Sequence, residues 1–365
     1  MTRKSTRRDF LRGIPAGDAA SDAPRARQGP GQASDQPPGG SYLIEVSRAA
    51  MACRFELLFN AGQYPNDTEA AVAALDVVEK LESQLSYFRP TSEISRLNLL
   101  GGDGPVPVSQ EVFDLLALAL DLSRQTGGAI DVTSTPLWEA WGFARRGGTV
   151  PTEDELAAAL EHVGNHLVEL DPGQRTVHFK HPAVRLNLGS LGKGYALDWA
   201  AEVLRSAGVA DFLFHGGQSS VLARGSELKQ GAEAPPSEGW TIGVRHPLRP
   251  DQRLGEIRLR NRSLGTSGAT FQYFRHKGRR YGHILDPRSG RPAERVLTST
   301  VVAPSATLAD ALSTAFFVMG PEQTAEFCRT RPEIAALLVC PAEGGRGIRV
   351  QTFGLHDELV LLEGG

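Results

Sequence analysis

The sequence predicts an α/β or α+β protein, because stretches with helical periodicity are mixed with many short apolar segments. The clearest helical stretch is 67–85, where Leu75, Val78 and Leu81 recur at helical spacing. An apolar content of 41% allows a substantial core to be buried. The 365 residues suffice for one large domain or two ordinary ones.

Capping residues locate several helix starts. Ser92, Ser109 and Ser305 each precede an apolar-periodic stretch, and Thr152 with Glu155 forms a capping box. We expect helices at 67–85, 92–97, 109–124, 152–162, 193–207 and 305–319, and another that starts at Pro321. We expect strands at 42–46, 53–59, 167–170, 176–180, 184–188, 212–214, 240–245, 255–259, 264–267, 298–303, 334–339 and 348–352.

The first forty residues differ from the rest in composition. They are rich in Pro, Gly, Ala, Ser and Gln and have almost no large apolar residues, which predicts a disordered segment at 1–40. Within it, Arg7 and Arg8 lie in a twin-arginine-like export motif. The residues that follow form a poor apolar h-region, so the signal looks degraded. We expect one folded domain over 41–365.

Composition excludes several classes of protein. The net charge is −3 with no long basic run after the first residues, which argues against non-specific nucleic-acid binding. No apolar run is long enough to cross a bilayer. Cys53, Cys328 and Cys340 are too scattered for a metal cluster or a disulfide framework, and are expected to be buried free thiols.

The most informative motif is His283-Ile-Leu-Asp286-Pro287-Arg-Ser-Gly290. Proline fixes φ and glycine permits positive φ, so the backbone after Asp286 must turn sharply. The apolar pair between His283 and Asp286 favours a strand, so His283 is expected near a strand end at one mouth of a sheet. The alternative is a strand that ends in a tight turn with a hydrogen-bonded histidine.

A glycine-rich segment, 187–195, separates a predicted strand from a predicted helix. Such a turn lets backbone N–H groups approach an anion, and Lys193 adds a positive charge suited to a phosphate. Its spacing fits neither the Walker motif nor a Rossmann loop, so a plain turn with a surface lysine remains the alternative. Asp198 either faces a ligand from the first turns of the helix or complements the helix N-terminus.

Asp310 and Thr314 lie four residues apart on a predicted helix, so their oxygens share one face. A carboxylate and a hydroxyl suit a hard cation such as Mg²⁺, which takes few protein ligands. Taken alone, the pair more often has no such role. Two further turns, 128–137 with its following aromatic cluster and 264–268 with its hydroxyls, are non-specific by themselves.

Two more segments, 51–55 and 85–98, complete an ordered set of six. The six blocks are 51–55, 85–98, 128–143, 192–198, 283–290 and 309–314. Their sequences and order resemble those of the ApbE family, the FAD:protein FMN transferases. The likeness covers roughly 51–320. It implies an ApbE-like fold, with a T-fold-related core of mixed sheets and packed helices.

The resemblance also implies an activity. Members of the family cleave FAD at its pyrophosphate and join FMN to a Thr or Ser hydroxyl of a partner protein, and AMP leaves. By this resemblance Asp310, Thr314 and the main-chain oxygen of Ser190 bind Mg²⁺, and His283 is the base for the acceptor hydroxyl. The expected FAD-binding residues are Met51, Phe88, Asn98, Asp131, Thr133, Lys193, Asp198, Thr266, Ser267 and Asp286.

Two departures keep other activities open. Gln218 stands where the family usually has an Asp, and Ala269 follows the Thr-Ser-Gly turn in place of an acidic residue. Hydrolysis of FAD to FMN and AMP, or flavin binding without catalysis, are therefore the alternatives to transfer. The family's usual acceptors are redox subunits of membrane electron-transport complexes. The family and the arginine pair favour export, whereas the poor h-region favours the cytoplasm.

Overall fold

A computed structural model describes residues 42–144, 147–228, 238–269, 272–342, 344, 347–355 and 358–362. The expected disordered segment and its twin-arginine-like motif lie outside the described residues. Within them, helices and antiparallel sheets are combined in a mixed α/β fold, as the sequence predicts.

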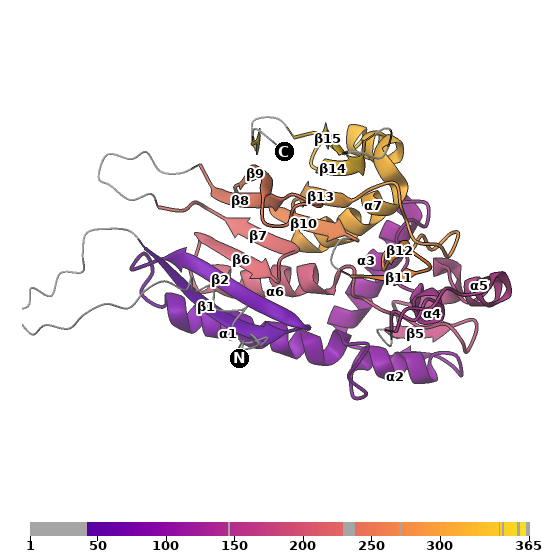
Figure 1. Cartoon of the computed structure of the whole chain (residues 1–365). Coiled ribbons are helices and arrows are strands. Elements are labelled where there is room, and N and C mark those ends of the chain that lie inside the picture. Colours follow the sequence, from indigo (N-terminus) through magenta and orange to yellow (C-terminus); the bar gives the residue numbers. More distant parts are fainter. Residues whose placement is uncertain are drawn as a thin grey trace, which may run out of the picture. The chain divides into compact units, whose positions relative to one another are not determined.

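An eight-stranded antiparallel sheet forms the centre of the fold (Figure 1). Its strands run in the order β1-β2-β6-β7-β10-β13-β14-β15, so neighbours in space are mostly near neighbours in the sequence. Their bounds are β1 Leu43–Ala50, β2 Cys53–Asn60, β6 Phe212–Gly216, β7 Ser220–Arg224, β10 Ser263–Gly268, β13 Thr298–Ala303, β14 Ala335–Pro341 and β15 Ile348–Phe353.

Three smaller sheets surround it. One has the order β16-β9-β8, with β8 at Trp240–Arg245, β9 at Arg253–Leu259 and β16 at Leu359–Leu361. Another has the order β3-β5-β4, with β3 at Val106–Pro107, β4 at Val168–Asp171 and β5 at Thr176–Phe179. The last is the hairpin of β11 (Tyr273–His276) and β12 (Arg279–Gly282).

The helices begin where the caps predict. Ser92, Ser109 and Ser305 accept backbone N–H groups at the starts of α2, α3 and α7, and Thr152 with Glu155 forms the capping box of α5. The bounds are α1 Asp67–Leu85, α2 Glu93–Leu100, α3 Gln110–Gln125, α4 Thr135–Ala140, α5 Glu153–Leu160, α6 Gly192–Ser206 and α7 Ala306–Arg329, with a 3₁₀ turn at Asn165–Leu167. In α7 the backbone is non-helical at Gly320, which agrees with the predicted new start at Pro321.

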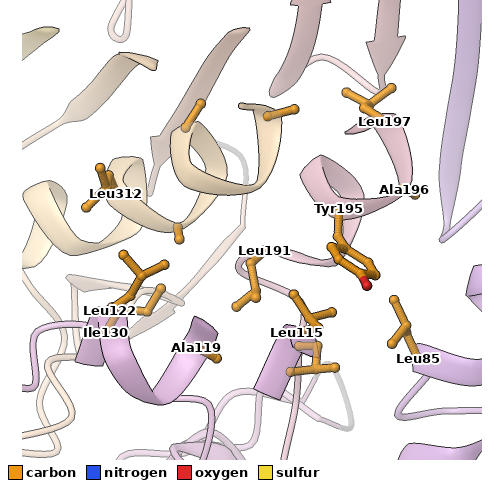
Figure 2. Close-up of a cluster of buried hydrophobic side chains, with 14 of the residues drawn as sticks. Leu85, Leu115, Ala119, Leu122, Ile130, Leu191, Tyr195, Ala196, Leu197 and Leu312 are labelled. Carbon is orange, nitrogen blue, oxygen red and sulfur yellow. The ribbon is translucent and has the colours of Figure 1, made fainter. Parts of the chain in front are cut away.

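Apolar cores lie on both faces of the central sheet, because alternate residues of a strand face opposite sides. Phe55, Leu57 and Phe59 of β2 belong to the core shared with α1, α6 and α7, whereas Leu58 packs on the core shared with β8 and β9. Figure 2 shows part of the helical core, in which Leu115 of α3 lies near Leu191 and to which Leu312 of α7 also belongs. The central sheet thus lies between a layer that contains α1, α6 and α7 and the small sheet of β8, β9 and β16.

One predicted strand, 184–188, is wrong. The segment forms no strand because its backbone bonds are taken elsewhere. The Asn98 side chain accepts from Leu186 N at 2.7 Å and donates to Leu186 O at 2.9 Å, and Asn187 N donates to Val132 O. Apolar content alone could not reveal this pairing with a distant side chain.

Two glycines allow neighbouring elements to approach α7 closely. A Cβ on Gly194 of α6 would lie 2.1 Å from the Ala306 carbonyl oxygen. A Cβ on Gly265 of β10 would lie 2.3 Å from the Ala309 carbonyl oxygen. Only residues without a side chain fit at these contacts, so the start of α7 is held between α6 and β10.

Gly194→Ala is expected to lower the free energy of unfolding by about 1–3 kcal/mol, because backbone atoms of α7 must move to admit the methyl group. Gly192→Ala on the same helix is the matched control. No heavy atom lies within 4 Å of its ideal Cβ, so it should be neutral or stabilise by up to about 1 kcal/mol. Urea unfolding of both variants measures the difference; equal stabilities would contradict the close approach.

Candidate active site

A cavity of about 750 Å³ lies at the ends of β10 and β13, beside the first turns of α6 and α7. Its size is that of a site for a drug-sized or larger ligand. The wall carries His283, Lys193 and Asp310, which come from three distant segments of the sequence. Its lining includes Phe88, Asp131, Trp138, Ser190, Gln218, Thr266, Ser267, Gln272, Thr298, Ser313 and Thr314.

Asp310 lies on α7 and is only 5% exposed. Its Oδ2 accepts hydrogen bonds from Gly194 N and from Ser220 Oγ, both at 2.8 Å. Burial raises the pKa of this carboxyl, against the lowering effects of Lys193, Ser220 and Gly194. Among the described residues, no hydrogen-bond donor reaches Oδ1, so this oxygen is available to a ligand.

Lys193 is the only charged residue of the glycine-rich turn, and its Nζ lies 3.9 Å from Asp310 Oδ2. That distance makes it a loose ion pair, with the ammonium still able to face an anion in the cavity. Ser190 lines the same cavity from the turn itself. The turn thus lies at the wall of the cavity, and its contact with a ligand stays a prediction.

Hydroxyl groups gather beside Asp310. Ser267 Oγ of β10 lies 2.8 Å from Ser313 Oγ and 2.9 Å from Thr314 Oγ1 of α7. Thr314 lies one turn after Asp310, and both line the cavity. Oxygen atoms of a carboxylate and a hydroxyl are thus brought to one wall.

This wall fits the predicted Mg²⁺ site. The described residues contain no group of three or more His, Cys, Asp or Glu side chains that could hold a metal, so an acidic cluster is not the source of affinity. The oxygens of Asp310, Thr314 and Ser190 are hard ligands, and Mg²⁺ keeps water or phosphate in its other positions. A buried carboxylate with one free oxygen also favours a nearby cation.

His283 directly follows β12 and lines the cavity, so it lies near a strand end as predicted. The apolar pair Ile284 and Leu285, which favoured a strand, forms only an isolated bridge between Leu285 and Pro292. Its Nδ1 lies 3.0 Å from the carbonyl oxygen of Gln272. A carbonyl can only accept, so Nδ1 carries the proton and Nε2 of the neutral ring is the basic nitrogen. Burial, and to a lesser degree the charge of Lys193, lowers the pKa of His283.

Aromatic residues form another part of the wall. The rings of Phe88 and Trp138 meet edge to face with centroids 6.3 Å apart, and both line the cavity. Phe88 is 68% exposed, which is unusual for a large apolar side chain. Together they offer a surface on which a planar ring could stack.

Several residues expected at the site do not line the cavity. The carboxylate of Asp198 instead accepts from Ala306 N and Thr307 N, at 2.8 and 2.9 Å, and so caps the N-terminus of α7. Asn98 holds the backbone of Leu186, as described above. Both residues fix elements that carry the cavity wall.

The remaining expected residues, Thr133, Asp286 and Met51, do not line the cavity either. Thr133 Oγ1 donates to Asp131, which does line the cavity, and Asp286 accepts from the Arg288 side chain at 2.8 Å. Met51 lies in the two-residue turn between β1 and β2 at a φ of +47°. Of the FAD-binding residues expected from the sequence, Phe88, Asp131, Lys193, Thr266 and Ser267 line the cavity.

Ser220 and Gln272 contribute to the site without a signal in the sequence. Ser220 is fully buried and bonds Asp310, but it is one of many serines in strand-like segments. Gln272 acts through its main-chain oxygen, so its side chain could not reveal it. The pairing of β7 with β10 brings Ser220 into place, and Gln272 lies beside His283 next to the start of β11.

Comparison with known proteins gives a consistent result. Residues 51–338 match the model of the ApbE family. The chain is 30% identical over 277 residues to the FAD:protein FMN transferase of Haemophilus influenzae, which covers 74% of this chain and 78% of that protein. It is 31% identical over 344 residues to the FAD:protein FMN transferase of Treponema pallidum, which covers 89% and 91%.

Solved structures show the same similarity. The ApbE protein of Thermotoga maritima has a TM-score of 0.74 and 30% identity, over 84% of this chain and 96% of that chain. The flavinyl transferase ApbE of Pseudomonas stutzeri has a TM-score of 0.74 and 28% identity, over 87% and 96%.

The imidazole of His283 is expected to titrate below pH 6.5, its ordinary value. Because the unfolded chain then binds more protons than the folded chain, the free energy of unfolding should rise with pH from the folded pKa up to 6.5. NMR titration of the ring carbon signals, assigned with His283→Gln, measures the pKa. Lys193→Met should raise it by removing a nearby positive charge. A pKa at or above 6.5 in the unmodified protein would contradict the burial argument.

Proposed function

Because the chain belongs to the ApbE family, we propose that it transfers FMN from FAD to a Thr or Ser hydroxyl of a partner protein. AMP leaves, and the reaction depends on Mg²⁺. One observation carries this proposal: a buried carboxylate, a lysine and a histidine whose Nε2 has no partner among the described residues line a single cavity of suitable size. The relatives named FAD:protein FMN transferase support the same class of transferase.

The step moves one phosphoryl group between two oxygens. The acceptor hydroxyl gives its proton to Nε2 of His283, and its oxygen bonds to the phosphorus of the FMN half of FAD. The bond from that phosphorus to the bridging oxygen breaks, and AMP leaves with the bridging oxygen. A hydroxyl is a weak nucleophile, so it needs a positioned base whose pKa lies near the operating pH. The lowered pKa of His283 keeps its imidazole neutral for this role.

The other residues hold the pyrophosphate. Lys193 places its ammonium beside the phosphates, while Asp310, Thr314 and the main-chain oxygen of Ser190 would hold the metal. Mg²⁺, when bound, neutralises charge on the phosphate oxygens. Phe88 and Trp138 face the planar ring, and Asp131, Thr266 and Ser267 contact FAD. Asn98, Thr133, Asp198 and Asp286 position these groups, and Met51 is proposed to contact FAD, as the resemblance implies.

The acceptor proposed for this chain is a redox subunit of a membrane complex.

In the described part of the chain, no helix combines the length and the apolar character that a membrane span needs. Gln218, which replaces the family's usual carboxylate, lies exposed in the cavity wall, and its amide can bond a phosphate or ribose oxygen. Its presence leaves the base and the metal wall intact.

The purified protein with FAD, Mg²⁺ and candidate acceptor domains should add the mass of FMN to an acceptor Thr or Ser. His283→Ala is expected to slow this transfer by about 10²–10⁴-fold, because the hydroxyl loses its base, with little change in the Kd for FAD. Mass spectrometry of the acceptor and fluorescence titration of FAD measure the two effects. Free FMN with AMP and no adduct would show hydrolysis, and unchanged FAD would show binding alone. Transfer by His283→Ala at the original rate would refute the base assignment.

Asp310→Asn tests the metal wall. One amide oxygen can still accept from Gly194 and Ser220, so the fold should survive, and a buried charge is removed. Because the amide has no charge to bury and Lys193 stays partly exposed, the metal-free variant should be about as stable as the unmodified protein. Mg²⁺ should raise the Tm of the unmodified protein but not that of Asp310→Asn. Equal Mg²⁺-induced shifts in both proteins would place the metal elsewhere.

A further inference from the structure

A second cleft, of about 380 Å³, lies between the central sheet and β8. Its floor includes Glu56 of β2 with Leu213 and His215 of β6. One wall is formed by consecutive residues of β8, from Thr241 to Arg245. This side of the sheet is opposite to α7, because Leu213 belongs to the core shared with β8 and β9.

The second cleft joins the active-site cavity at a common rim. Gln218, Thr266 and Thr298 line both of them. The two faces of β10 show how this arises: Ser267 contacts Thr314 on the α7 side, whereas Thr266 Oγ1 lies 3.0 Å from Thr300 Oγ1, which lines the second cleft. A peptide bound in this cleft would therefore reach the cavity that His283 lines.

The wall of the cleft is a strand edge. Among the described strands, β8 pairs with β9 alone, so the other side of Thr241–Val244 faces the cleft without a partner strand. An edge of this kind offers a row of backbone N–H and C=O groups. The four residues Thr241–Val244 span roughly 13 Å in an extended strand.

The edge of β8 also extends towards the rim of the active-site cavity. Trp240 Nε1 donates to Arg224 O at 2.8 Å, which places the start of β8 beside the far end of β7. The cleft lined by β8 also reaches the other end of β7, because Gly217 and Gln218 of the turn before Ser220 line it as well. The strand edge thus leads from the surface to the rim of the active-site cavity.

We propose that a segment of the acceptor protein binds in an extended form along the free edge of β8 and carries its hydroxyl over the rim formed by Gln218, Thr266 and Thr298. This inference rests on the proposed function, which requires a polypeptide and FAD in the site at the same time. With FAD in the cavity, the acceptor needs another entrance, and the cleft is continuous with the cavity. Strand addition uses main-chain hydrogen bonds, and alternate side chains of the segment meet the apolar and polar floor.

Hydrogen exchange tests the proposal directly. The His283→Ala variant, saturated with FAD, is mixed with the acceptor domain that gains FMN in the transfer assay. The backbone amides of Thr241–Val244 should then exchange more slowly, whereas those of β15, an outer strand on another edge, should not change. Unchanged exchange in β8 on addition of the acceptor would overturn the inference. Protection of β8 by FAD alone would also overturn it, because the cleft would then belong to the dinucleotide.

A blocking substitution gives an independent measurement. Thr241→Trp covers the edge and should raise the KM for the acceptor about tenfold, the effect of losing one or two good hydrogen bonds. The KM and Kd for FAD should not change. Thr352→Trp on β15 is the matched control, since Thr352 is also an exposed threonine on an outer strand.

If both variants kept the original acceptor KM, the docking edge would be wrong while the proposed function would stand. If the unmodified protein transferred no FMN to any acceptor, the proposed function itself would fail. If Thr241→Trp did not fold, the exchange experiment on the unmodified strand would still decide the question.

Discussion

The site depends on the burial of one carboxylate, that of Asp310. Its Oδ2 accepts hydrogen bonds from Gly194 N of α6 and Ser220 Oγ of β7. The elements α6, β7 and α7 are thus joined at a single oxygen atom. Burying a charge is costly unless it is paired and hydrogen-bonded, and these two bonds with Lys193 only partly compensate. Further positive charge can reach this carboxylate from the cavity side, where the proposed metal ion would lie.

Close packing makes this arrangement possible. Gly194 and Gly265 admit the backbone of α7 at distances that no Cβ would allow, and Asp198 caps the first residues of α7 with backbone hydrogen bonds. The start of α7 is therefore fixed by two contacts with α6 and one with β10. A ligand bound by Asp310 and Thr314 is bound by a rigid helix, which reduces the entropy lost on binding.

Local signals in the sequence were sufficient for the capped helices α2, α3, α5 and α7, but they did not predict the short helix α4. Ser109 and the pair of Thr152 and Glu155 mark helix starts because capping is decided within four residues. The strand prediction for 184–188 was wrong because the side chain of Asn98, distant in sequence, forms hydrogen bonds with the backbone of Leu186. The shared cavity of His283, Lys193 and Asp310 could be expected only from the resemblance to a family, since nothing in their spacing relates the three.

The same limit applies to polar residues that position others. Asp198 carries the right chemistry for a ligand contact, and its spacing from Lys193 puts it near the start of α6. It turns instead to the N-terminus of α7, because unpaired N–H groups there attract a carboxylate as strongly as a ligand would. Which partner wins depends on how α6 and α7 pack, and that is decided by Gly194, where a side chain would separate the two helices.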